Sequence, residues 1–488
     1  MDPRTPVLVG IGVASQRVDD AAQASEPLDL MLAAVRRAAS DAVPEPARLL
    51  AGIGRVAVPR GRWRYRNPGG AVARAIGAER AVTLLASVGV LQQTLIGDAC
   101  RAIAEGETDT ALVVGGDAGY RLLRAGIAGG VASEQQQDDA PDVLLAPRDE
   151  LLHPAEARAG LKMPVGLYAI IESAWRAANG WSVEEHRDRL ARLYARFSAI
   201  AADNPFAWNR EQVAANQIRN ASERNPMQAF PYTRLHCSTW NVDQAAALIF
   251  CSARRADKLG IAVSRRVYPV ASTESNHMTP VSARARLGAC PGAGIAGRAA
   301  LDAAGLAPSE VDLVELYSCF PVAVETCCEE LKLPPARDLT VTGSMAFAGG
   351  PFNNYVLQAT CRMAQLLREG RGRHGLVSSV SGLLTKQGFG IWSSRPGRDG
   401  FALRDVSGEV ARALDTRPVL ESAEGSARIA GCTVLYERGK PPRGVAVVDV
   451  GEARAVVETG DAALLDRMES SELCGTQVHL GPGHSFTL

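Results

Sequence analysis

The chain has 488 residues, with 53 Lys and Arg against 53 Asp and Glu, and 47% of its residues are hydrophobic. This length predicts about two to four domains. The zero net charge argues against a nucleic-acid partner, and the apolar content excludes disorder of the chain as a whole. No apolar run approaches the length of a membrane span, and the first residues lack the basic region of a signal peptide. We therefore expect a cytoplasmic protein with no membrane partner.

The ten cysteines include no C-x-x-C pair, which excludes zinc ribbons and thioredoxin-type motifs and predicts no metal site. Most of them stand in apolar runs and are interpreted as reduced core residues. Cys100, on the apolar stripe of an expected helix, is an example.

The first part of the chain alternates short apolar strands with amphipathic helices. Strands are expected at Val7–Gly12, Ala81–Leu85 and Thr110–Val114, and helices at Leu28–Ala39 and Leu91–Glu105. This βαβα order with continuous apolar strands is typical of an α/β fold built on a parallel-rich sheet.

The pattern changes between about residues 120 and 235 and then returns. The intervening part reads as a long, mainly helical insertion that covers one end of the sheet. Strands follow at Val242–Phe250, Val267–Ala271, Val311–Leu316 and Leu376–Val380, with helices at Gly292–Ala304, Pro321–Leu331 and Asn354–Arg368. We therefore expect an N-terminal half at residues 1–265, which includes the insertion, and a similar C-terminal half at 266–404.

After Phe401 the composition shifts to short strands separated by Gly and Pro turns. Strands are expected within Gly431–Tyr436, Gly444–Val450 and Ala453–Glu458. This pattern predicts a small OB-like β-barrel domain at residues 405–488.

Four local patterns, in this order, resemble the thiolase superfamily. The turn Ala86–Val90 precedes a helix and then the strand Thr108–Asp117. Asn241–Ala247 is similar to the family's V-D-G-A-A-A, and Glu315–Phe320 to the E-x-H-D-C-F of sterol-carrier-protein-type thiolases. Gly349-Gly350-Pro351 stands where the family has Gly-His-Pro, with Ser381-Gly382 near its final turn.

The resemblance implies two similar α/β halves in a layered αβαβα core. The tail resembles the additional C-terminal domain of thiolase-like proteins of type 1. The resemblance to the thiolase superfamily also implies a coenzyme A thioester as ligand, with no covalently bound cofactor.

The residues at the family's catalytic positions differ from what its chemistry requires. Thiolases use a cysteine at a helix start, where aligned N–H groups lower the thiol pKa, and histidines that stabilise the thioester oxyanion. By the resemblance, Gly89 stands at the cysteine position, and Gly350 and Tyr317 at the two histidine positions. Ser381 stands near the position of the acid/base cysteine. We therefore predict that ordinary thiolysis and condensation are lost.

The remaining candidates for chemistry are two tyrosines and a cysteine. Tyr317 follows a buried strand, and its phenol is suited to donate a hydrogen bond to a thioester oxygen or to carry a proton; filling the space of the family's histidine is the alternative interpretation. Tyr355 begins a helix near the same site, and Cys319 faces either the site or the core. Gly89, Gly349, Gly350, Ser381, Gly382 and His277 are the expected substrate-binding positions.

Three functions remain open at this point. The first is an acyl-CoA-binding protein that breaks C–C bonds without a covalent intermediate, as do the tyrosine-dependent thiolase-fold aldolases that the pattern resembles. The second is a non-catalytic subunit or scaffold, as a monomer, a homodimer or with a partner subunit, since thiolases associate through an exposed strand. The third is acetyl-CoA acetyltransferase-type acyl transfer with a relocated nucleophile, Cys319 or Ser87.

Overall fold

The structure is a computed structural model that describes residues 1–334 and 336–488. Within these residues, the N-terminal half forms a six-stranded mixed sheet of order β1-β8-β4-β2-β3-β5. Its strands are β1 (Pro6–Gln16), β2 (Arg55–Pro59), β3 (Val82–Ala86), β4 (Thr110–Ala118), β5 (Val143–Leu145) and β8 (Asp243–Ser252).

The C-terminal half forms a second sheet of order β10-β11-β12-β9-β13. Its strands are β9 (Tyr268–Ser275), β10 (Leu313–Glu315), β11 (His374–Ser381), β12 (Lys386–Ser393) and β13 (Ala402–Asp405). In the N-terminal half, β8 lies antiparallel between β1 and β4, and in the C-terminal half, β12 lies antiparallel between β9 and β11. β4 in turn runs parallel to β2, and β11 to β10, so the expectation of two similar α/β halves is confirmed.

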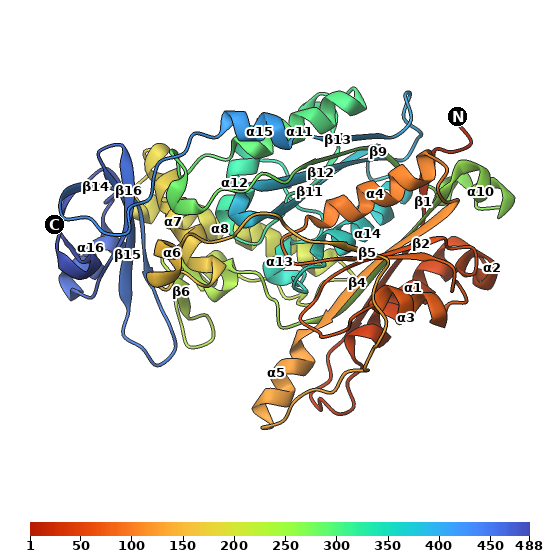
Figure 1. Ribbon diagram of the computed structural model, residues 1–488, viewed down its shortest axis with the longest axis horizontal. Coiled ribbons are helices and arrows are strands. Elements are labelled where there is room, and N and C mark those ends of the chain that lie inside the picture. The colour runs from red at the N-terminus through yellow and green to blue at the C-terminus, as the bar shows by residue number, and fades with distance from the viewer. Residues whose placement is uncertain (335) are drawn as a thin grey trace.

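Two helices, α4 (Gln92–Ala104) and α14 (Tyr355–Arg368), lie between the two sheets (Figure 1). Both are buried on most of their circumference, as expected for helices with apolar residues on several sides. Cys100 is fully buried in α4, as its position in the apolar stripe predicted.

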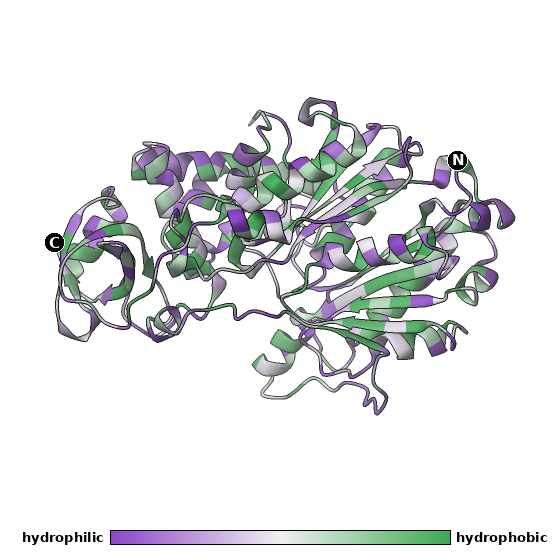
Figure 2. Cartoon of the chain, turned by 45° about the horizontal axis from the view of Figure 1, so that its top comes forward, coloured by the Kyte–Doolittle hydropathy of each residue, from purple (hydrophilic) through white to green (hydrophobic). Residues whose placement is uncertain are grey.

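The outer layers complete an αβαβα arrangement. Helices α1 (Pro27–Ala42) and α3 (Pro68–Ala75) cover the N-terminal sheet, and α11 (Pro291–Ala304) covers the C-terminal sheet, with α12 (Pro321–Glu330) beside it. Figure 2 shows that the strands are mostly hydrophobic, whereas hydrophilic residues gather on outer helices and loops. Short helices α2 (Pro46–Leu50), α10 (Ala253–Lys258) and α13 (Ser344–Phe347) join these elements.

The insertion is mainly helical, as the sequence predicted. It contains α5 (Gly119–Ile127), α6 (Pro154–Arg158), α7 (Pro164–Ala178), α8 (Val183–Asp203) and α9 (Ala215–Arg219), followed by the short strands β6 (Met227–Ala229) and β7 (Tyr232–Thr233). Helix α8 begins at a capping box in which Ser182 and Glu185 satisfy each other's backbone N–H groups. No helix among the described residues is both long and apolar enough to span a membrane.

The tail forms a third, antiparallel sheet of order β16-β15-β14-β17-β18, and β6 of the insertion pairs with β14. Its elements are α15 (Ser407–Ala413), β14 (Gly425–Leu435), β15 (Arg443–Val450), β16 (Ala453–Thr459), α16 (Ala462–Ser470), β17 (Gln477–Leu480) and β18 (Phe486–Thr487). This sheet packs on α7, at the blue end of the molecule in Figure 1. The domain limits given above stay predictions.

Candidate functional site

The turn between β3 and α4 is built around Gly89. Gly89 has a φ of +98°, a conformation that favours glycine over residues with a side chain. A Cβ atom built on Gly89 would lie 3.0 Å from Cγ of Pro147, and the three nearest atoms all belong to that proline. A side chain at the position where the family resemblance places a cysteine is therefore disfavoured by the backbone conformation and crowded by the Pro147 ring.

Lys386 reaches this turn from the opposite sheet. It is the first residue of β12, it pairs with Ser381 of β11, and its Nζ donates a hydrogen bond to the Gly89 carbonyl oxygen at 3.1 Å. Burial lowers the pKa of the Lys386 amine, and the charge of Asp149 opposes this shift. The sequence signal for Lys386 was available, because it is the only charged residue between His374 and Arg395.

The loop that contains His277 lies against the turn that follows β11, at Gly382. A Cβ atom on Gly382 would lie 2.5 Å from Sδ of Met278, the residue after His277. The His277 Nε2 is 3.1 Å from the Thr279 hydroxyl. Lys386 and these contacts bring together Gly89, Ser381 and Gly382, and His277 precedes Met278 in the loop beside them.

Tyr317 lies beyond the end of β10, because that strand covers only Leu313–Glu315 instead of the expected Val311–Leu316. Its backbone N–H donates to the Ser378 hydroxyl at 2.7 Å, and the residue is 8% exposed. Burial raises the pKa of the Tyr317 phenol, with the neighbouring Cys319 as a second cause, while a hydrogen bond with Gln92 lowers it. The phenol is therefore neutral near pH 7 and retains a proton that it can donate.

Gln92 joins the two central helices, and the sequence reasoning missed it. It is the first residue of α4, its Oε1 accepts from the Val356 N–H of α14 at 2.7 Å, and its Nε2 donates to Asn353 Oδ1 at 3.2 Å. Because Gln92 also contacts Tyr317, the starts of both central helices and the predicted catalytic tyrosine meet at one side chain.

Tyr355 stands edge-on to Tyr317, with ring centroids 5.6 Å apart, but its hydroxyl is already engaged. It donates to Glu315 Oε1 at 2.5 Å and lies 2.6 Å from the Thr342 hydroxyl, and the residue is 1% exposed. Burial, and then the Glu315 charge, hold the pKa of Tyr355 well above its usual value. These contacts favour a structural role for Tyr355 over a catalytic one.

The Gly349-Gly350 pair lies where side chains of other segments fill the space. A Cβ atom on Gly350 would lie 2.1 Å from the Ser238 hydroxyl oxygen and 3.0 Å from Cε of Met345. Gly349 has a φ of +98°, and its Cβ would lie 2.2 Å from Oε1 of Gln244. No room is left for a histidine at Gly350 without movement of Ser238.

Cys319 lies near Gly350, because its carbonyl oxygen accepts a hydrogen bond from the Ser238 N–H at 3.2 Å. The residue is 9% exposed, and burial raises the pKa of its thiol to about 12 while a hydrogen bond with Tyr168 lowers it. Near pH 7 only a minute fraction of this thiol is the nucleophilic thiolate.

No family model matches the sequence. The chain is 28% identical over 213 residues to an acetyl-CoA acetyltransferase of Methanocaldococcus jannaschii and 29% identical over 176 residues to that of Methanothermobacter thermautotrophicus. These matches cover 42% and 36% of the chain and span 49% and 43% of the two relatives, which is about half of their length.

Among solved structures, the chain is similar to a monomeric SCP2-thiolase-like protein type 1 from Mycobacterium smegmatis. The two share 27% identity with a TM-score of 0.84, and the match covers 100% of both chains. An Ltp2–ChsH2(DUF35) aldolase matches with a TM-score of 0.61 at 18% identity, over 81% of this chain and 99% of that one.

Human mitochondrial 3-ketoacyl-CoA thiolase in complex with CoA matches with a TM-score of 0.57 at 16% identity, over 80% of this chain and 98% of that one. The aldolase and this thiolase, at such low identity, show the fold alone. The full-length similarity to the SCP2-thiolase-like protein, the acetyltransferase matches and the two similar sheets agree with one another. The chain has the thiolase fold, and its sequence is similar to those of thiolase-superfamily proteins.

Proposed function

We propose that this protein binds an acyl-CoA thioester between its two halves and cleaves a β-hydroxyacyl-CoA without a covalent acyl-enzyme. The observation that carries the proposal is the packing at the two glycines. A side chain at position 89 would be crowded by Pro147, and one at position 350 would overlap the Ser238 hydroxyl, while a neutral phenol, Tyr317, lies at the start of the central helix α4.

The ligand class is inferred from the comparisons. The matched relatives are acetyl-CoA acetyltransferases, and one structural neighbour of the same fold was solved in complex with CoA. The reaction class follows from the local chemistry, because Cys319 is held as a thiol by burial and an aldolase is among the neighbours of similar fold.

In the proposed reaction, the proton of the substrate β-hydroxyl passes to a base and the Cα–Cβ bond breaks. The β-carbon leaves as an aldehyde or ketone, and the bonding electron pair forms a thioester enolate. Tyr317 donates a hydrogen bond to the enolate oxygen and gives a proton to Cα, which yields the shorter acyl-CoA; the proton taken up by the base then passes to the Tyr317 phenolate and restores both groups. Lys386 is the proposed base, because its lowered pKa favours the free amine.

The test is turnover of β-hydroxyacyl-CoA thioesters of different chain length, followed by release of carbonyl product and shorter acyl-CoA. Tyr317→Phe is expected to lower kcat by about 10²- to 10⁴-fold, the usual contribution of a positioned acid or base. Tyr194→Phe is the matched control, because it removes a buried hydroxyl that has no partner among the described residues. Full activity of Tyr317→Phe would remove that role.

Mass spectrometry separates the other two functions. An acyl adduct on Cys319 or Ser87 after incubation with acyl-CoA would establish a relocated nucleophile in place of the proposed mechanism. Absence of both turnover and CoA binding in the folded wild type would leave the scaffold function.

A further inference from the structure

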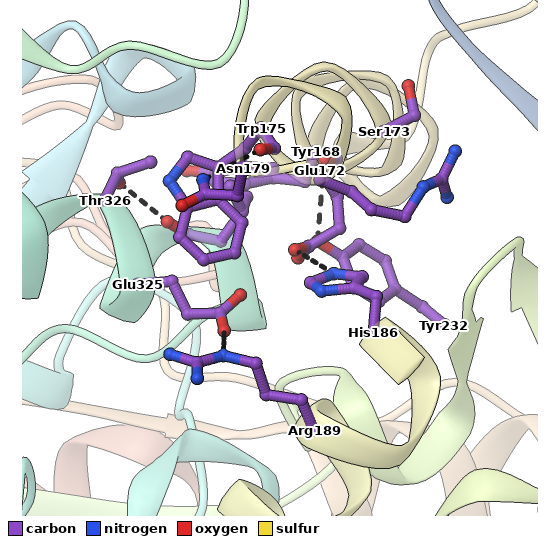
Figure 3. Close-up of polar contacts among 12 residues, drawn as sticks. Tyr168, Glu172, Ser173, Trp175, Asn179, His186, Arg189, Tyr232, Glu325 and Thr326 are labelled. Carbon is purple, nitrogen blue, oxygen red and sulfur yellow. Dashed lines mark hydrogen bonds and ion pairs between the residues drawn. The ribbon is translucent and has the colours of Figure 1, made fainter. Parts of the chain in front are cut away.

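Three buried ionisable side chains meet where the insertion packs on the C-terminal half. They are Glu172 of α7, His186 of α8 and Glu325 of α12, and one potential ligand atom from each lies within 4.8 Å of the other two (Figure 3). The side chains of Glu172 and His186 have no exposed surface, and that of Glu325 is 3% exposed.

Part of the hydrogen-bonding capacity of this cluster is already used. His186 Nε2 lies 2.7 Å from Glu172 Oε1, and the Tyr232 phenol donates to the other Glu172 oxygen. Arg189 Nε donates to Glu325 Oε1 at 3.0 Å.

Two atoms of the cluster lack any partner within the part of the chain that the structure describes. These are Oε2 of Glu325 and Nδ1 of His186, and both are buried. The group that faces Glu325 Oε2 is the Glu172 carboxyl, and burial together with this neighbour raises the pKa of Glu325 to about 8. Figure 3 shows that the Glu325 oxygen not held by Arg189 points toward the Glu172–His186 pair. An ionised carboxylate only accepts hydrogen bonds, so two buried carboxylates that face each other need a cation or a proton between them.

A pocket borders the cluster on the side of Glu325. It has a volume of about 650 Å³ and is lined by Glu325 together with Trp175, Trp181 and Arg189. Carboxylate oxygens combined with one imidazole nitrogen suit Zn²⁺ and Mn²⁺, whereas Mg²⁺ and Ca²⁺ prefer oxygen ligands throughout.

We propose that Glu172, His186 and Glu325 bind one divalent transition-metal ion of the Zn²⁺ or Mn²⁺ class. The ion links α7 and α8 of the insertion to α12, and the contacts of Tyr232 and Arg189 orient the two carboxylates from behind. Its role is structural, and the proposal does not depend on the reaction proposed above.

The first experiment measures metal binding to the full chain after treatment with a chelator. Titration with Zn²⁺ against a chromophoric competitor, and elemental analysis of the dialysed protein, are expected to give one ion per chain and a Tm higher by a few degrees. Glu325→Gln is expected to weaken binding at least tenfold. Glu329→Gln is the matched control, because Glu329 lines the same pocket one turn further along α12 and contacts Trp175 instead.

A second measurement keeps the proposal testable if a variant does not fold. Mn²⁺ bound to the wild type is expected to show coupling to one imidazole nitrogen in pulsed EPR, and the signal is expected to vanish in His186→Gln. Absence of stoichiometric binding by the folded wild type would show that the carboxylates share a proton instead, and equal binding by folded Glu325→Gln would equally overturn the site.

Discussion

At the scale of single residues, the candidate site is defined by the atoms that surround Gly89 and Gly350. Gly89 and Gly350 are glycines for different reasons. The first has a backbone conformation that side chains disfavour, whereas the second has the Ser238 hydroxyl where its Cβ would be. Restoring the family's residue therefore needs a second change at either position. At Gly89 the backbone conformation has to change, and at Gly350 the Ser238 side chain has to move or be removed.

Gly350→His alone is expected to lower the free energy of unfolding by about 1–3 kcal/mol, because an added side chain must displace Ser238 and Met345. Combining it with Ser238→Gly is expected to recover most of this loss, since the nearest obstructing atom is removed. Urea unfolding of the two single variants and the double variant gives the coupling energy. Strictly additive effects would show that Ser238 is not the obstacle.

Cys319 gives a prediction on pH. Since burial raises its thiol pKa to about 12, the thiolate fraction increases about tenfold for each unit of pH across the range from 7 to 10. Alkylation of Cys319 by iodoacetamide, followed by peptide mass spectrometry, is expected to be very slow at pH 7 and to rise steadily without a plateau. A plateau below pH 8 would indicate an activated thiol and would favour the relocated nucleophile.

At the scale of elements, the two central helices could be predicted from the sequence, but their junction could not. Buried strands read as continuous apolar runs, and α4 and α14 carry apolar residues on several sides, so their positions in the chain were evident. The roles of Gln92 and Lys386 depend on hydrogen bonds with Val356 and Gly89, which lie far away in the sequence. The periodicity of apolar residues along the chain carries no information on such contacts. The same holds for Ser238 against Gly350.

Gln92→Leu tests the junction of these helices. The change leaves the Val356 N–H, which lies in the buried start of α14, without its acceptor. A buried donor left without a partner costs about 1–3 kcal/mol, so the free energy of unfolding in urea is expected to fall by that amount. Gln92→Glu retains an acceptor and serves as the control, and an equal loss in both variants would count against the hydrogen bond as the cause.

At the scale of the whole molecule, the tail is joined to the core through α7. The Ser173 hydroxyl of α7 accepts from the Cys432 N–H of β14 at 2.8 Å, and the buried Arg176 pairs with Glu472 at 2.8 Å. The composition shift after Phe401 predicted a separate β-rich unit, but no sequence pattern indicated that β6 of the insertion adds to its sheet. That pairing joins strands far apart in the chain.

Gly431→Val probes this interface. A Cβ atom on Gly431 would lie 2.8 Å from the Ile170 carbonyl oxygen of α7, so a larger side chain separates the tail from the helix. Calorimetry is expected to show one transition for the wild type and two for the variant. Gly460→Val is the control, because a Cβ atom there meets nothing within 4 Å, and a single unchanged transition in Gly431→Val would refute tight docking.

The edge strand β5 has a consequence for self-association. Its residues Val143–Leu145 pair in parallel with β3, and they are contributed by the same chain. A strand of a second molecule could pair with β3 only after it had displaced β5. As the edge strand of the sheet, β5 is only three residues long and lies between Asp142 and Pro147, so it is a poor partner for a further strand. β5 is therefore expected to limit strand pairing between molecules at this edge of the N-terminal sheet.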